Sequence, residues 1–128
     1  MASDREIGEE IMAILEQDRA WRRANRRAFL AEIAEDLWRT MPDGEALDDY
    51  RLRLQGVPWW ASDVVECLEW VLAERPDWAV PTLTEASGRS WWLTDYLPGD
   101  EAVYLSWLAE QTAEMRRALD EARGGPRR

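Results

Sequence analysis

Apolar residues near the start of the chain follow a helical spacing that changes direction partway along. Residues 7–28 carry apolar side chains at four- and seven-residue steps, and Asp18 and Asn25 occupy the skipped positions. The first set is Ile7, Ile11, Ile14, Trp21 and Ala28, and the second is Phe29, Ile33, Leu37 and Met41. On a helical wheel the second set lies roughly a third of a turn from the first. We therefore expect a long helix over 4–41 that breaks near residues 24–28 or whose halves contact different surroundings.

Two further helices are predicted before residue 76. Residues 43–56 have apolar positions that suit a short helix, although the alternation of Tyr50, Leu52 and Leu54 with polar residues also suits a strand. We favour the helix. Asp63 followed by Glu66 forms a capping-box pattern, which predicts that the next helix begins there and ends before Pro76.

The segment 77–95 is compatible with two structures. One is a small hairpin in which residues 80–84 pair with residues 90–94, and the other is one-turn helices joined by loop. The Pro98-Gly99-Asp100 sequence then opens a last helix to about residue 123. Its predicted inward positions are Tyr104, Trp107, Leu108, Met115 and Leu119.

These elements together predict a mostly α fold. Four to five helices surround a Trp-rich core, the long N-terminal helix projects or forms a dimer, and a minor β-hairpin near 80–94 is the open alternative. The 128 residues fit one helical domain over 1–123, followed by a flexible tail over 124–128. A hydrophobic content of 46% is sufficient for such a core.

The composition removes several kinds of chemistry. The chain has no His and a single Cys, and all 16 of its basic side chains are Arg. It therefore has no Ser-His-Asp triad, no His-ligated metal and no intrachain disulfide. Cys67 is expected to be a small core residue, and we predict no catalytic residue, no metal site and no cofactor. The acidic start is not a signal peptide and no apolar run approaches ~20 residues, so a cytoplasmic protein is expected.

One short segment reverses the acidic balance of the chain. The net charge is −10, yet residues 19–27 hold five arginines and no acid: Arg19, Arg22, Arg23, Arg26 and Arg27. Three interpretations remain open. Carboxylates of the same chain or of a second copy neutralise the arginines, or an acidic partner protein binds them, or they contact RNA or DNA phosphates. These five arginines are the predicted partner-binding residues.

Two tryptophan pairs are candidates for an aromatic pocket. Trp59-Trp60 and Trp91-Trp92 are each followed by an aspartate, Asp63 and Asp95. Aromatic rings closed by a carboxylate hold quaternary ammonium groups, methylated lysine or arginine by cation–π attraction. Ordinary core packing, with the aspartates as helix caps, is the favoured interpretation.

Two pairs of carboxylates have a spacing that suits Mg²⁺. Glu32 and Glu35, then Glu45 and Asp48, lie three residues apart and so share a helix face within each pair. Over about 17 residues this arrangement resembles that of the all-α nucleotide pyrophosphohydrolases of the MazG type. The resemblance implies a Mg²⁺-dependent enzyme, which is the lesser alternative here.

The sequence as a whole favours a non-catalytic interaction protein. We expect an acidic helical inhibitor, immunity-type protein or accessory subunit from a bacterium or phage. It would bind a macromolecule through its acidic surface, through the arginine patch, or through both. The partner is expected to be a protein with a basic surface, and a homodimer is compatible with the long first helix. The alternative is an accessory subunit that contacts nucleic acid through residues 19–27.

Overall fold

The structure, a computed structural model, describes residues 3–39, 43–87 and 101–124, and in these residues every regular element is helical. The elements are α1 (Asp4–Ala24), α2 (Arg26–Ile33), the π-helical segment η1 (Ala34–Trp38), α3 (Asp43–Gly56), α4 (Pro58–Glu74), α5 (Ala79–Ser87) and α7 (Glu101–Ala122). The predicted mostly α fold is confirmed. None of the described helices is long and apolar enough to cross a membrane.

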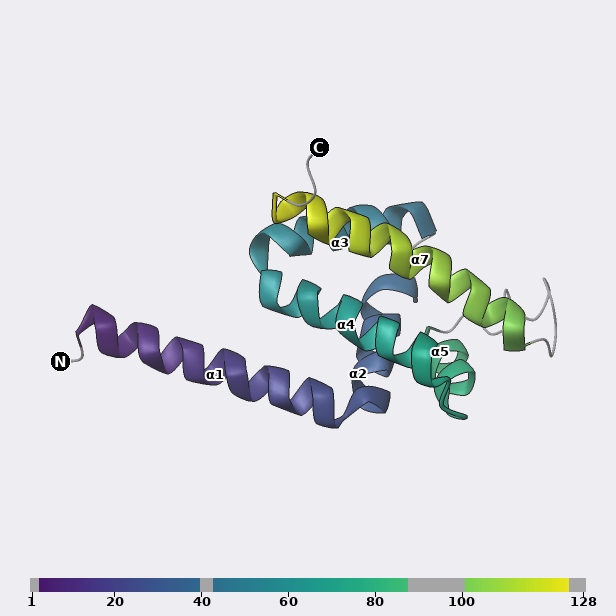
Figure 1. Cartoon of the computed structure of the whole chain (residues 1–128), viewed down its shortest axis with the longest axis horizontal. Coiled ribbons are helices and arrows are strands. Elements are labelled where there is room, and N and C mark those ends of the chain that lie inside the picture. Colours follow the sequence, from purple (N-terminus) through teal and green to yellow (C-terminus); the bar gives the residue numbers. More distant parts are fainter. Residues whose placement is uncertain (1–2, 40–42, 88–100, 125–128) are drawn as a thin grey trace.

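Helix α4 occupies the centre of the body. It contacts α7 and α3 on one side and α1 and α2 on the other, while α5 covers α2 and η1 (Figure 1). The largest fully buried side chains line this centre: Trp38, Tyr50, Phe29, Leu30, Ile33, Leu37, Leu68, Leu83, Leu108, Met115, Val64 and Val65. The described body is thus built by α2, η1, α3, α4, α5 and α7, and α1 lies against its outer surface.

The long N-terminal helix breaks at Asn25, within the predicted interval. The Asn25 side-chain amide donates to the Trp21 carbonyl oxygen at 2.9 Å, and its backbone N–H donates to the same oxygen at 2.8 Å. Asparagine competes with helical hydrogen bonding in this way. Before the break no residue of α1 is buried, whereas Phe29, Leu30 and Ile33 after it are fully buried. The break and the change of surroundings together explain why the apolar positions change direction.

Helix α4 begins five residues before the predicted start. Pro58 takes the first helical position, where its fixed φ suits the helix and its missing N–H is not needed. Asp63 therefore lies inside the helix and is not an N-cap, so the capping-box prediction was wrong. The two acids mark one face of α4, because residues three apart share a face.

The segment after α4 is helical where a strand was the alternative. Residues 80–84 belong to α5, so the first strand of the hairpin was a wrong alternative, while residues 90–94 lie outside the described residues. Pro81 falls in the first turn of α5, where proline is tolerated. The Thr84 hydroxyl donates to the carbonyl oxygen of Val80 at 3.1 Å.

The prediction of a Trp-rich core is not confirmed. Trp38 is fully buried and makes an edge-to-face contact with Trp107 at 5.0 Å between ring centroids. Other described tryptophans are only partly buried around the core: Trp60, Trp70, Trp78 and Trp107. Most of the described core is aliphatic, and the tryptophans cover its margin, where an indole N–H can reach a polar partner.

Candidate interaction surface on α1

Helix α1 is held to the body by arginines that bind a buried aspartate. Arg19 Nε donates to Asp63 Oδ1 at 3.0 Å, and Arg22 Nη1 donates to Asp63 Oδ2 at 2.8 Å. Asp63 is only 3% exposed. A carboxylate removed from water needs charged partners on its oxygens, and the two guanidinium groups supply them. This pair of bonds ties the second half of α1 to the middle of α4.

Glu66, one helical turn after Asp63, extends this attachment. It accepts a bidentate pair from Arg23, with Nε at 2.6 Å and Nη2 at 2.9 Å, and it lies near Arg19 Nη2 and Arg26 Nη2 at 3.9 and 3.7 Å. The hydrogen bond from Arg23 is the main cause that lowers the pKa of Glu66, and the same bond raises the pKa of Arg23. We call these six residues the clasp: Arg19, Arg22, Arg23, Arg26, Asp63 and Glu66.

The spacing of the four clasp arginines explains why they act together. Positions 19, 22, 23 and 26 are separated by three- and four-residue steps, which place their side chains on one face of a helix. Asp63 and Glu66 have the same three-residue spacing on α4. The structure therefore agrees with the interpretation in which carboxylates of the same chain bind the arginine patch: four of its five arginines pair with Asp63 and Glu66, which balance two of the five positive charges.

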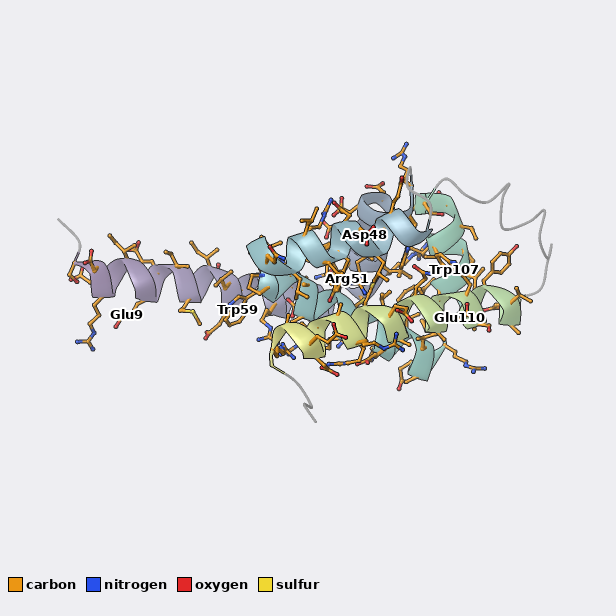
Figure 2. The ribbon with its side chains drawn as sticks, turned by 90° about the horizontal axis from the view of Figure 1, so that it is seen from above. Glu9, Asp48, Arg51, Trp59, Trp107 and Glu110 are labelled. Carbon is orange, nitrogen blue, oxygen red and sulfur yellow. The ribbon has the colours of Figure 1, made fainter. Side chains whose placement is uncertain are left out.

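Aromatic rings flank the clasp and form cation–π contacts with two of its arginines. The Arg19 guanidinium lies over the Trp59 ring at 4.9 Å, and the Arg26 guanidinium lies over the Trp70 ring at 4.8 Å. Trp59 is labelled in Figure 2 at the place where α1 meets the body. These cation–π contacts add to the ion pairs that hold α1.

The predicted aromatic pocket is only partly within the described residues. Trp59 faces Arg19, Trp60 faces Arg53 at 5.2 Å, and Asp63 binds Arg19 and Arg22. Each of these three groups therefore already has a cation from the chain itself. The remaining members, Trp91, Trp92 and Asp95, lie outside the described residues.

Arg27 differs from the other four arginines. It is exposed, and within residues 3–39, 43–87 and 101–124 it forms no ion pair. It lines an open groove of about 1,100 Å³ between α2 and α5, together with Arg23 and Arg26. Trp70 and Trp78, which stack at 6.1 Å, also line this groove. Among the contacts of the described residues, Arg27 is thus the member of the predicted patch that no carboxylate binds.

The carboxylate pairs proposed for Mg²⁺ lie exposed on separate elements. Glu32 belongs to α2 and Glu35 to η1, whereas Glu45 and Asp48 belong to α3. In the described part of the chain no three acidic, cysteine or histidine side chains are grouped closely enough to hold a metal ion. The metal site that the MazG-type resemblance implies is therefore not assembled by these residues.

The first part of α1 carries an apolar face that no residue of 3–39, 43–87 or 101–124 covers. Figures 1 and 2 both show this end of the helix extending beyond the body, and Glu9 on it is labelled in Figure 2. We define the α1 stripe as four exposed side chains of this helix: Ile7 (45% exposed), Ile11 (52%), Ile14 (57%) and Trp21 (45%). On a helical wheel the centre of the stripe lies roughly 110° from the centre of the arginine face that contacts α4. The stripe therefore faces sideways, away from the body.

The α1 stripe was not among the residues predicted as a site. Its spacing was visible in the sequence, but apolar residues at helical steps usually mark a buried face. One feature of the sequence could have indicated that this face is not buried. Two polar residues, Asp18 and Asn25, interrupt it. Comparisons with protein-family models, with curated proteins and with solved structures give no match for this chain.

Proposed function

We propose that this protein is a non-catalytic interaction protein that binds another protein through the α1 stripe. The observation that carries the proposal is the exposure of Ile7, Ile11, Ile14 and Trp21 on a helix that extends beyond the body. Isoleucines on a soluble helix usually face a core, because each buried side chain contributes about 1.5–3 kcal/mol. A row of large apolar side chains left in water along one helix face is typical of a surface that a partner covers.

The charges around the stripe indicate the chemistry of this partner. Residues 1–18 contain six acids and one arginine, and the whole chain has a net charge of −10. The partner we propose is an amphipathic helix whose apolar face is flanked by Arg or Lys. Such a helix would lie along α1 with its anchors three and four residues apart, and opposite charges would speed association and fix the orientation.

A pull-down with matched variants tests the proposal. The bait is the wild-type protein, the double variant Ile11→Ser with Ile14→Ser, or the control Leu52→Ser, all used on nuclease-treated lysate of the source cell. Leu52 is 67% exposed on α3, so the control removes a similar apolar side chain from the body. We expect a protein retained by wild type and by the control and lost at least tenfold from the double variant. Equal recovery by all three baits, or recovery of nothing, would reject the proposal.

A nucleic-acid contact is the second candidate function, and Arg27 is the residue that favours it. Arg27 is exposed and lies beside Arg23 and Arg26 at the groove between α2 and α5. A phosphate at the other four arginines would have to compete with Asp63 and Glu66, so Arg27 is the side chain to change. Arg27→Glu should weaken binding to a labelled RNA hairpin at low salt, whereas Arg51→Glu on α3 should not. No binding by wild type, or equal binding by both variants, would reject this candidate.

A further inference from the structure

We infer that the helix that covers the α1 stripe is α1 of a second copy of this chain, lying antiparallel to the first. The inference rests on the proposed function and names the partner. The chain contains a helix with both features, since α1 combines an apolar stripe with four arginines, Arg5, Arg19, Arg22 and Arg23. Three features of α1 support the pairing: its spacing, its charge and its place on the body.

The spacing of α1 is that of a coiled-coil seam. Positions 7, 11, 14, 18 and 21 alternate four- and three-residue steps, which is the pattern of core positions in paired helices. Three isoleucines occupy the first three of these positions. When the helices run antiparallel and are centred near Met12, Ile11 lies against Ile14 of the partner subunit, and the two-fold symmetry repeats this layer. Ile11 and Ile14 then cover one another at the middle of the contact, and Ile7 lies opposite Asp18 of the partner subunit near each end.

Asp18 favours the antiparallel orientation over the parallel one. In a parallel in-register pair the two Asp18 carboxylates would face each other in the seam, where like charges repel strongly once water is excluded. In the antiparallel pair they are about eleven residues apart along the axis, or roughly 16 Å at 1.5 Å per residue. Each carboxylate then lies near an end of the contact, where water remains available.

The charge of α1 leads to the same orientation. Residues 1–18 have a net charge of −5, and residues 19–27 carry five arginines. Two of the five positive charges are balanced inside the chain by Asp63 and Glu66, so a net charge of +3 remains at that end. Antiparallel pairing brings the acidic end of each α1 beside the basic end of the other, whereas parallel pairing brings like ends together.

The place of α1 on the body leaves room for this contact. The first part of the helix extends beyond the body, and the stripe does not face α4, so a second helix can lie along it (Figure 1). The overlap of residues 4–21 is about 27 Å long. Two helices of that length bury on the order of 1,000 Å² in total, which is at the low end of specific interfaces. We therefore expect a dimer with a dissociation constant in the micromolar range.

Analytical ultracentrifugation of the purified full-length chain tests the pairing. Wild type and Leu52→Ser are expected to change from monomer to dimer between about 1 and 200 μM, and the dimer should weaken as salt is raised. The double variant Ile11→Ser with Ile14→Ser should weaken the dimer at least tenfold. Both serines replace exposed side chains, so circular dichroism should show the body still folded. A dimer unaffected by the double variant would overturn the inference.

Spin labels measure the orientation. In a Cys67→Ala background, Ala13→Cys places labels near the centre of the antiparallel pair, and Ala20→Cys places them about 22 Å apart along the axis. We expect a clearly longer distance between labels at 20 than between labels at 13. Equal distances at both positions would contradict the antiparallel arrangement. A protein that stays monomeric at every concentration in the ultracentrifuge would reject self-pairing. The proposed function would still hold in that case if the pull-down recovers a protein with wild type and loses it with the double variant.

Discussion

Arg22 Nη1 donates a hydrogen bond to Asp63 Oδ2 at 2.8 Å, across 41 positions of the sequence and from a helix with no buried residue to one at the centre of the body. Asp63 is 3% exposed, and Arg22 is 18% exposed at its side chain. Because no residue of α1 is fully buried, the ion pairs and cation–π contacts of the clasp are what hold this helix against α4. The position of the α1 stripe therefore depends on the charge of α4.

Removing the charge of Asp63 should release α1. We predict that Asp63→Asn lowers the free energy of unfolding by about 1–3 kcal/mol, because Arg19 and Arg22 lose a carboxylate and a buried amide is left incompletely bonded. Hydrogen–deuterium exchange should rise in the second half of α1 more than in α4. Asp48→Asn is the matched control, since Asp48 is 77% exposed and its contact with Arg51 spans 3.6 Å, so its effect should stay within about 0.5 kcal/mol. Unchanged exchange in α1 of Asp63→Asn would contradict the role of the clasp.

The clasp should also weaken in acid through Glu66. The hydrogen bond from Arg23 lowers the pKa of Glu66 below its ordinary value of 4.5. A group whose pKa is lowered by folding stabilises the folded state above its ordinary pKa and loses that contribution as the pH falls through the lower value. The difference in stability between wild type and Glu66→Gln should thus be constant above about pH 5.5 and shrink below pH 4.5. A difference that stays constant down to pH 3 would show that the Glu66 carboxylate is not held by arginine.

The helices could be predicted from the sequence more reliably than their boundaries. The apolar steps predicted a helical segment over 4–41, where α1 and α2 lie, and favoured a helix over a strand for α3. A break near residues 24–28 was one of two explanations for the change of direction, and it occurs at Asn25. The start of α4 was predicted wrongly because one sequence pattern, an acid followed three residues later by glutamate, occurs in two places. At the N-terminus of a helix the pattern forms a capping box, and inside a helix it places two acids on the same face. Pro58 was the correct signal.

The site could be predicted only in part. The five arginines were visible as a group, and their neutralisation by the same chain was one of three open interpretations. Asp63 and Glu66 could not be identified as the partners of α1, because more than 40 positions separate them from Arg19 to Arg23 and that pairing depends on how α1 crosses α4. The α1 stripe has the spacing of a core face. Only the three-dimensional arrangement shows that the body lies on another side of the helix.

Cys67 should behave as a core residue and not as a reactive thiol. Its side chain is 1% exposed, its Sγ lies 3.8 Å from the Arg26 carbonyl oxygen, and burial raises the pKa of the thiol to about 11. At pH 8 only about one thiol in a thousand is then ionised, and the thiolate is the reactive form. Ellman's reagent should react with the native protein at least a hundredfold more slowly than with the protein in guanidinium chloride. Reaction at the same rate in both conditions would contradict the buried position.

Glycine at position 75 should stabilise the end of α4. Arg75 has φ 48° and ψ 57°, the left-handed conformation, and its N–H donates to the Val71 carbonyl oxygen at 2.8 Å. Pro76 follows and disfavours the right-handed helical region for Arg75, so the chain turns here at a cost of about 1 kcal/mol for any residue with a Cβ. Glycine avoids this cost but has more freedom in the unfolded chain, which offsets about half of the gain.

We therefore predict that Arg75→Gly raises the free energy of unfolding by about 0.5 kcal/mol, measured as the midpoint of urea unfolding at unchanged slope. Arg75→Ala is the matched control, because it removes the same exposed guanidinium and keeps the strained Cβ. Arg75 forms no ion pair with any residue in the described ranges, so the alanine variant should match wild type within about 0.3 kcal/mol. A glycine variant less stable than the alanine variant would show that α4 does not end in the left-handed conformation.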